Sequence, residues 1–238
     1  MNWRLKDPKR IQIQPSYKCN LNCKFCWKTI HENGSLEEMS DEKWLEITEN
    51  LCDLDIDKVI ISGGGEPLMR KTLISKLIKN FKENDIGGSL VTNGTLFDRK
   101  LINTTIENHW DEINISLHSP RVEINDFLRD KEGSTKKTLE NIKKINKLKE
   151  KKEKPRITIN AVINEYNYDH LEEFKKFAQE FKIDHVIFRL LQGNPKDCKF
   201  VPKDKLEILL EKLRKIKPSK KTNFHFSFSE NEVENYYE

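Results

Sequence analysis

The chain has 238 residues, of which 36% are hydrophobic and 34% are charged, and its formal net charge is +4 at pH 7. A chain of this length can bury a sizeable core without disulfide bonds, and so small a net charge gives no reason to expect a nucleic-acid partner. No apolar stretch approaches the ~18–20 residues that span a bilayer, and the N-terminus has no apolar signal segment, so we expect a cytoplasmic protein without membrane contact.

Short runs of β-branched residues alternate with longer amphipathic stretches along the whole chain. The expected strands are 11–14, 58–62, 89–91, 112–117, 157–163 and 185–190, and the expected helices are 40–53, 71–84, 98–108, 135–151, 171–181 and 203–216. Strands that are separated by helices pair in parallel through right-handed connections. Six strand–helix units are fewer than the eight of a closed barrel, so we expect an α/β fold with a partial (β/α)6 TIM-like barrel. A doubly wound open sheet is the alternative.

The C-terminal end of the chain is predicted to lie outside this repeating pattern. We expect one core domain over residues 1–222, because no stretch rich in Gly, Pro or Ser separates two domains. Residues 223–238 form a C-terminal tail in this interpretation, and 224–228 alternate like a further strand. The tail is therefore expected to be an extra strand or the start of a truncated extension.

Three of the five cysteines lie close together directly after the first expected strand, in the pattern C-x3-C-x2-C formed by Cys19, Cys23 and Cys26. Thiolates are the usual ligands of iron–sulfur clusters, and a cubane with only three protein thiolates keeps one iron open to a small molecule. A Cys3His zinc site with His31 as the fourth ligand is the alternative. The loop lacks a second pair of metal ligands, and a strand–helix scaffold does not need zinc to fold, so the spacing favours a cluster.

Further motifs follow the next three expected strands in a fixed order. They are the glycine-rich segment 63–67 (GGGEP), the segment 92–94 (TNG) and the segment 116–119 (SLHS). Together with the cysteine pattern, in which Phe25 precedes the last cysteine, these motifs resemble the radical S-adenosylmethionine (SAM) superfamily over residues 9–195. The resemblance implies a radical SAM core domain, with its ligands at the carboxyl ends of parallel strands.

The resemblance also implies roles for individual residues. Cys19, Cys23 and Cys26 would hold a [4Fe-4S] cluster, and SAM would bind the open iron. The residues implied to contact SAM or to complete the rim of its site are Phe25, Gly64, Gly65, Glu66, Asn93, Ser116, Arg129, Asn164 and Arg189. Glycines without a Cβ atom let the backbone approach a ligand, and a carboxylate such as Glu66 can accept charge-assisted hydrogen bonds from an ammonium group.

The chemistry implied by the resemblance is the reductive cleavage of SAM to a 5′-deoxyadenosyl radical, which abstracts hydrogen from a substrate. It implies an external one-electron donor, such as a flavodoxin or a ferredoxin-like protein. The segment 114–135 is similar to members with SPASM or twitch extensions, which mature peptides and cofactors. Only Cys52 and Cys198 follow the cysteine loop, so we expect no auxiliary cluster, and the chain is then a minimal enzyme or a truncated core.

The sequence leaves three functions open. The first is modification of a peptide or protein side chain by a radical SAM enzyme, and the second is the same chemistry on a small metabolite or nucleotide. The third is a non-catalytic Cys3His zinc or iron–sulfur binding module. Single residues also keep simpler interpretations. Arg129 could form a surface ion pair, His118 could be a packing or rim residue, and the thiols Cys52 and Cys198 could be buried or incidental.

Overall fold

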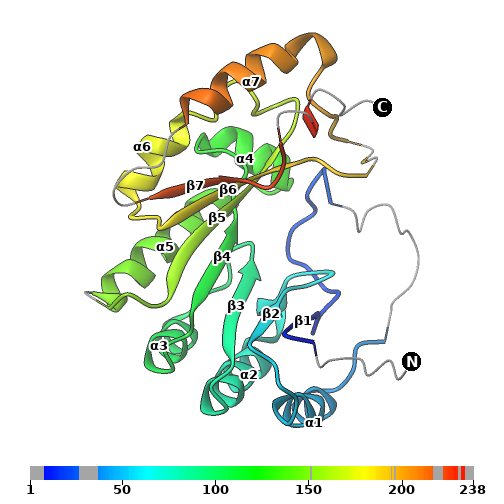
Figure 1. Ribbon diagram of the computed structural model, residues 1–238, viewed down its shortest axis with the longest axis vertical. Coiled ribbons are helices and arrows are strands. Elements are labelled where there is room, and N and C mark those ends of the chain that lie inside the picture. Colours follow the sequence, from blue (N-terminus) through cyan, green and yellow to red (C-terminus); the bar gives the residue numbers. More distant parts are fainter. Residues whose placement is uncertain are drawn as a thin grey trace, which may run out of the picture.

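Figure 1 shows the computed structural model of the chain. It describes residues 8–26, 37–150, 152–193, 195, 197–216, 222–229 and 232–233. Within these residues, seven strands form one sheet in the order β1-β2-β3-β4-β5-β6-β7, and every neighbouring pair is parallel. The strands are β1 (Arg10–Ile13), β2 (Lys58–Ile61), β3 (Gly87–Thr92), β4 (Glu112–Ser116), β5 (Arg156–Ile163), β6 (His185–Leu190) and β7 (Asn223–Phe226). The predicted parallel α/β architecture is confirmed.

Helices connect the strands and cover the convex side of the curved sheet (Figure 1). They are α1 (Asp41–Cys52), α2 (Lys71–Glu83), α3 (Arg99–Glu107), α4 (Val122–Arg129), α5 (Ser134–Lys149), α6 (Glu173–Glu180) and α7 (Leu206–Lys215), with short 3-10 helices η2 (Pro67–Arg70) and η3 (Lys203–Lys205). Because the strands keep their sequence order in one curved sheet, the predicted partial TIM-like barrel is confirmed. None of the described helices is long and apolar enough to cross a membrane.

Two features of the fold extend the six strand–helix units of the sequence-based expectation. First, β7 is the extra strand that the alternating segment 224–228 indicated, and it pairs in parallel with β6, so the described sheet has seven strands. The alternating segment joins the sheet because Phe224 and Phe226 pack against the core. Second, the sequence pattern does not predict α4, because Val122 and Phe127 on this helix are exposed and Leu128 is its one fully buried apolar residue. The domain boundary at residue 222 stays a prediction.

The outer face of the sheet carries the hydrophobic core. On β4, Ile113 and Ile115 are fully buried under the helices. The helical periodicity of α2 predicts one buried face, and the side chains that form it are Leu73, Ile74, Leu77, Ile78 and Phe81. Burying an apolar side chain of this size contributes roughly 1.5–3 kcal/mol relative to leaving it in water. This core therefore fixes the strands, and with them the strand ends that carry the motifs.

The opposite face of the sheet, which we call the inner face, is polar. Side chains alternate between the two faces along a strand, and the strand register aligns those that share a face. The inner face consists of Arg10, Gln12, Lys58, Ile60, Ser89, Val91, Glu112, Asn114, Ser116, Arg156, Thr158, Asn160, Val162, His185, Ile187, Arg189, Asn223 and His225. Parallel sheets usually bury apolar residues on both faces. The polar inner face is therefore suited to solvent or a polar ligand, and not to a second layer of helices.

Candidate functional site

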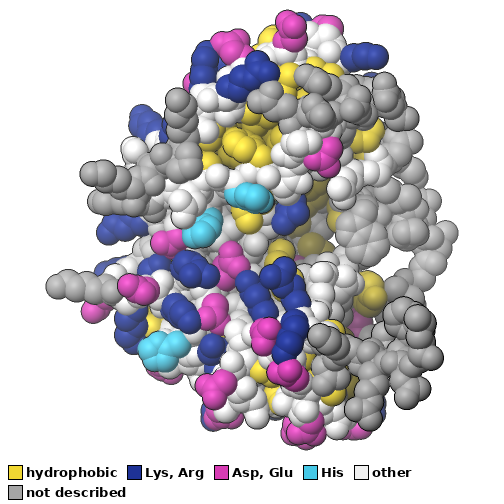
Figure 2. All heavy atoms as spheres, in the orientation of Figure 1, with side chains coloured by type: hydrophobic (Ala, Val, Ile, Leu, Met, Phe, Trp, Pro, Cys, Tyr) yellow, Lys and Arg dark blue, Asp and Glu magenta, His cyan; other side chains and the backbone are white. Residues whose placement is uncertain are grey.

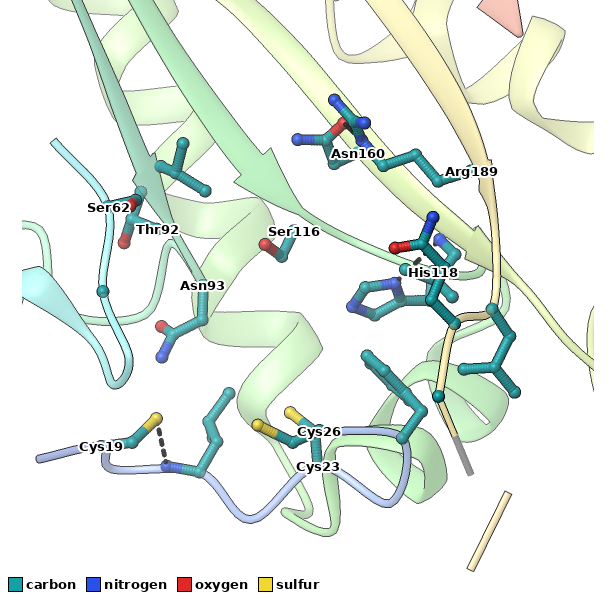
Figure 3. Close-up of a pocket in the computed structure, with 18 of the residues that line it drawn as sticks. Cys19, Cys23, Cys26, Ser62, Thr92, Asn93, Ser116, His118, Asn160 and Arg189 are labelled. Carbon is teal, nitrogen blue, oxygen red and sulfur yellow. Dashed lines mark hydrogen bonds between the residues drawn. The ribbon is translucent and has the colours of Figure 1, made fainter. Parts of the chain in front are cut away.

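The cysteine loop follows β1 and borders a pocket of about 1040 Å³ at the carboxyl ends of the strands. Figure 3 shows Cys19, Cys23 and Cys26 along one side of this pocket. The amide of Cys26 donates a hydrogen bond to the carbonyl oxygen of Cys23 at 3.0 Å, and the amide of Lys24 donates to that of Leu128 at 2.9 Å. The first bond closes a turn within the loop, and the second connects the loop to Leu128 of α4. The three thiols lie on the side of the loop that borders the pocket.

The thiols of this loop have the ligand chemistry of an iron–sulfur cluster. Among the described residues, no three His, Cys, Asp or Glu side chains are grouped so that they could hold one metal ion. A cubane takes each thiolate on a different iron, so its ligands stand apart around the cluster. His31, the predicted fourth zinc ligand, lies outside the described residues. Three thiols beside an open pocket match a cluster with one accessible iron.

A buried positive charge lies close to the cysteine loop. Burial raises the pKa of the Cys23 thiol to about 12, and the charge of Arg129 opposes this rise. Because cluster ligands are thiolates, a nearby guanidinium favours the form of Cys23 that binds iron. The two remaining cysteines do not line the pocket. Cys52 packs against the main core and Cys198 is buried in a smaller apolar cluster with Phe25, so both contribute to packing.

Glu66 follows β2 and lines the pocket wall, with only 2% of its surface exposed. Its Oε1 accepts hydrogen bonds from Thr92 Oγ1 at 2.6 Å and from the amide of Leu68 at 3.0 Å, while its Oε2 accepts one from the amide of Asn93 at 2.7 Å. Burial raises the pKa of Glu66 above its usual range, although these donors and the charge of Arg129 act in the opposite direction. The carboxylate joins the ends of β2 and β3. Its Oε2 accepts one of these hydrogen bonds and has a second lone pair that can accept another.

Gly64 and Gly65 bring the end of β2 against the segment that enters the cysteine loop. The amide of Glu66 donates a hydrogen bond to the carbonyl oxygen of Lys18 at 2.8 Å. A Cβ atom on Gly65 would lie 2.2 Å from that same carbonyl oxygen, and a Cβ atom on Gly64 would lie 2.5 Å from the ring of Tyr17. Any side chain at Gly65 would therefore displace loop backbone. The glycines serve backbone packing, and the ligand approach expected from the sequence stays a prediction.

Asn93 and Ser116, from the motifs after β3 and β4, both line the pocket (Figure 3). The side chain of Asn93 donates a hydrogen bond to Asn20 Oδ1 at 2.9 Å and accepts one from Thr95 Oγ1 at 2.7 Å. Asn20 Nδ2 in turn donates to Thr95 Oγ1 at 2.9 Å. This closed set of hydrogen bonds fixes the cysteine loop to the end of β3. The side chain of Ser116 is directed into the pocket in Figure 3.

Arg129 is fully buried and is not among the residues that line the pocket. Its guanidinium donates hydrogen bonds to the carbonyl oxygens of Asn93 and Ser116 and to Thr138 Oγ1. The interpretation of Arg129 as a surface ion pair is wrong, because the last residue of α4 turns this side chain inward beneath the strand ends. Arg129 orients the backbone of two residues that line the pocket.

Phe25 lines the pocket and meets the ring of His118 edge-on, with the ring centroids 4.4 Å apart. His118 is buried, and its Nδ1 accepts a hydrogen bond from the amide of Val162 at 3.2 Å. Burial, and then the charge of Arg129, lower the pKa of His118 to about 3, so the ring is neutral at pH 7. His118 therefore packs the pocket wall and gives Phe25 a fixed position beside the cysteine loop.

The two residues predicted at the ends of β5 and β6 have different positions. Arg189 is exposed and lines the pocket, and its Nε donates a hydrogen bond to Asn160 Oδ1 at 3.3 Å (Figure 3). Asn164 is fully buried and lies outside the pocket lining. Its Nδ2 donates to the carbonyl oxygen of Val162 at 3.1 Å, and its Oδ1 accepts from the amide of Tyr166 at 2.9 Å. The expectation that Asn164 lies at the rim is corrected, because this side chain closes the turn after β5.

The pocket also has lining residues that the sequence pattern does not single out. They include Ser62, Asn160, Ser227, Phe228 and Glu232. Ser62 directly precedes the glycine-rich segment after β2, so its strand-end position is a signal that could have identified it. Asn160 lies within β5, and no motif marks it. The last three follow β7 near the end of the chain, where no motif marks them.

The chain is similar in sequence and in fold to known proteins. A family model described as the Radical SAM superfamily matches residues 13–178. The chain is 25% identical to the PqqA peptide cyclase of Granulibacter bethesdensis over 74% of this chain and 45% of that protein, and 36% identical to the probable GTP 3′,8-cyclase of Methanococcus aeolicus over 47% and 38%. The solved structure of Streptococcus suis SuiB bound to precursor peptide SuiA has the same fold, with a TM-score of 0.75 and 22% identity over 97% of this chain and 51% of that one. The chain thus spans about half the length, or less, of these relatives.

Proposed function

This chain belongs to the radical SAM superfamily, whose members use a [4Fe-4S] cluster and SAM, and we propose that it carries out radical chemistry on a peptide or protein side chain. The observation that carries the proposal is the meeting of three thiols and three strand-end motifs around one pocket. These segments lie far apart in the sequence, and parallel strands bring their carboxyl ends to one edge of the sheet.

The cysteine loop is proposed to hold the cluster through Cys19, Cys23 and Cys26. Phe25 lies between the last two of these cysteines and offers the face or edge of its ring to the adenine of SAM. Its edge-on contact with His118 fixes the position of the ring beside the cysteine loop. When bound, the reduced cluster and SAM supply one-electron cleavage of the SAM sulfonium and hydrogen abstraction from a substrate carbon.

The strand ends are proposed to bind SAM itself. Gly64 and Gly65 leave room for close approach of the ligand, and Glu66 Oε2 can accept a hydrogen bond from the SAM ammonium. Asn93 and Ser116, which both line the pocket, are proposed to bind the ribose and methionine parts. Arg129 is proposed to act indirectly, since its hydrogen bonds hold the backbone of both residues.

Two observations favour a peptide substrate over a small metabolite or nucleotide. The similarity to the PqqA peptide cyclase spans 74% of the chain, whereas the similarities to probable GTP 3′,8-cyclases span 45–58%. The inner face is also open to solvent at several positions along its strands, including Gln12, Arg156 and His225. Small ligands are usually enclosed by a pocket, so an accessible face of this extent suits an extended chain better. An external one-electron donor, of the flavodoxin or ferredoxin type, completes the proposed reaction.

The test of the radical function is anaerobic reconstitution with iron and sulfide, followed by reduction with dithionite in the presence of SAM. We expect one cubane cluster for each chain and formation of 5′-deoxyadenosine, measured by chromatography and mass spectrometry. A colourless protein that holds one zinc ion and forms no 5′-deoxyadenosine contradicts the proposal and supports a zinc-binding module.

The choice of substrate is tested separately with deuterium-labelled compounds. Transfer of deuterium into 5′-deoxyadenosine from a labelled peptide library, and not from labelled nucleotides, supports the peptide proposal. Transfer from nucleotides alone contradicts it and leaves the radical chemistry in place.

A further inference from the structure

Positive charge predominates on the inner face. Arginines stand on three of its strands, as Arg10 on β1, Arg156 on β5 and Arg189 on β6, and Lys58 stands on β2. Among the described residues of this face, Glu112 is the single carboxylate. Figure 2 shows His side chains over β6 and β7, with Lys and Arg side chains close by. The face therefore presents much more positive than negative charge.

The single carboxylate is already neutralised by its neighbours. Glu112 Oε2 lies 3.5 Å from Lys58 Nζ, and Glu112 Oε1 accepts a hydrogen bond from Thr158 Oγ1 at 2.6 Å. Burial acts to raise the pKa of Glu112, but the Thr158 hydroxyl and the Lys58 ammonium hold it below its usual value. Glu112 and Lys58 thus cancel each other, and the net charge of the face is that of its arginines.

The guanidinium groups of the three arginines are accessible to a ligand. Arg10, Arg156 and Arg189 are all exposed, and within the described part of the chain none of them has an ion pair. Arg189 donates one hydrogen bond from Nε to Asn160 Oδ1, beside which its side chain lies in Figure 3, and it lines the pocket. Like charges on one face give it a positive potential, which attracts an anionic group.

The positions of these arginines indicate the shape of that anionic group. Arg189 lies at the pocket, whereas Arg10 and Arg156 occupy the first positions of β1 and β5, at the far end of the strands. Asn160 lines the pocket four residues after Arg156, which is about 13 Å along an extended strand. A phosphate group is bound by donors that converge on it. Arginines spread over this distance instead match separate carboxylates of an extended chain.

We propose that the inner face binds acidic side chains that flank the modified residue of a peptide substrate. Arg189 contacts the acidic residue nearest to the reacting side chain, and Arg156 contacts an acidic residue about four positions away along the extended peptide. Arg10, on β1 and four strands from β5 in the sheet order, contacts a separate acidic residue. The proposal rests on the proposed peptide-modifying function and adds the charge and spacing of its substrate.

The test measures the binding of model peptides to the reconstituted holoenzyme with SAM present. The probe is a fluorescein-labelled hexaglutamate peptide, followed by fluorescence anisotropy, with labelled hexaserine as the neutral reference and GTP as a competitor. We expect hexaglutamate to bind at least tenfold more tightly than hexaserine and to bind more weakly as salt is raised. Equal binding of the two peptides overturns the proposal, and so does a site that GTP occupies and hexaglutamate does not.

Variants locate the binding on the inner face. Arg156→Glu and Arg10→Glu are each expected to weaken hexaglutamate binding at least tenfold, whereas Arg156→Lys keeps most of it. The matched control is Arg99→Glu, which changes an exposed arginine at the start of α3 and is expected to alter binding less than twofold. Circular dichroism checks that each variant is folded. Wild-type affinity in a folded Arg156→Glu variant overturns the proposal.

The same preparation separates this inference from the proposed function. If the wild-type holoenzyme forms 5′-deoxyadenosine but does not prefer hexaglutamate, only the inference about acidic peptides is overturned. If it forms no 5′-deoxyadenosine, the radical function itself is rejected, whatever the peptide result.

Discussion

The carboxyl group of Glu66 accepts a hydrogen bond of 2.7 Å from the backbone amide of Asn93, so one buried polar side chain joins the ends of β2 and β3. Both residues also line the pocket. A single side chain thus supports the wall of the proposed SAM site and offers an acceptor to the ligand. This double role makes the position sensitive to small chemical changes.

Glu66→Gln is expected to lower both stability and SAM affinity. A glutamine has one acceptor oxygen and one amino group, so it cannot accept from Asn93 and from Thr92 and Leu68 at the same time. An unsatisfied buried donor costs about 1–3 kcal/mol, which urea unfolding would measure. The KM for SAM is expected to rise at least tenfold in the 5′-deoxyadenosine assay. Glu107→Gln, at the exposed end of α3, is the control, and an unchanged KM in Glu66→Gln contradicts the proposed role.

Gly65→Ala is expected to disturb the cysteine loop more than Gly64→Ala. The added Cβ at Gly65 meets the backbone carbonyl of Lys18, whereas the added Cβ at Gly64 meets the side chain of Tyr17, which can rotate. Overpacking of this kind costs about 1–3 kcal/mol. Iron content after reconstitution and the urea midpoint would report the difference. Equal losses in the two variants would show that the backbone contact is not the deciding factor.

Arg129→Met is expected to destabilise the fold by about 2–4 kcal/mol, because it removes the donors of three hydrogen bonds in a buried setting. The carbonyl oxygens of Asn93 and Ser116 would lose a partner, so the pocket wall should loosen and SAM binding should weaken. Arg99→Met is the matched control, since Arg99 is exposed. Urea unfolding and isothermal titration with SAM measure the two effects, and full stability in Arg129→Met contradicts this account.

His118 is expected to make the fold sensitive to acid. Its pKa is lowered by burial and by Arg129 from 6.5 to about 3 in the folded chain, so between these values the unfolded chain binds a proton that the folded chain does not. The contribution to stability is therefore complete above pH 6.5 and is lost as the pH falls toward 3. Between pH 6.5 and 5 the loss is about 2 kcal/mol.

His118→Asn tests this pH dependence, because asparagine keeps an acceptor for the amide of Val162 but does not titrate in this range. Urea unfolding at pH 7, 6 and 5 should show a shallower decline in the variant than in the wild type. The comparison uses slopes, so a constant cost of the substitution does not affect it. Parallel declines would show that His118 does not titrate as its burial implies.

Cys23→Ser is expected to lose the cluster and the formation of 5′-deoxyadenosine. A serine hydroxyl does not replace a thiolate as an iron ligand, and the loop would keep only Cys19 and Cys26. Cys52→Ser is the control, because Cys52 lies on α1 and does not line the pocket. Iron analysis and visible absorption measure the outcome. Loss of iron in Cys52→Ser alone would contradict the assignment of the ligand loop.

Much of the fold could be predicted from periodicity alone. The predicted strand 185–190 coincides with β6, and the predicted helix 71–84 ends one residue beyond α2. In both elements the buried residues repeat at the period of the structure they form. α4 could not be predicted in this way, because it is short and its exposed Phe127 and Val122 give no clear apolar face. Its position depends on contacts with distant segments, such as the bond between Leu128 and the cysteine loop.

The sequence predicts which residues of the candidate site lie at strand ends, but it does not predict the direction in which their side chains point. The sequence indicates which residues follow which strand, and this suffices to bring the cysteines, Glu66 and Asn93 to one pocket. It does not indicate whether a side chain turns toward the ligand or into the protein. Arg129 and Asn164 turn inward because backbone carbonyls and amides nearby offer them hydrogen bonds. Such contacts form only when the chain is folded.

The sheet has an apolar outer face and a polar inner face, and the two faces are expected to tolerate amino-acid substitutions to different degrees. Substitutions on the outer face open cavities in the core, whereas those on the inner face leave the helix packing as it is. A library randomised at Gln12, Arg156, Ile187 and His225 should therefore yield mostly folded members. The scaffold would allow recognition of new partners to be selected while its architecture is kept.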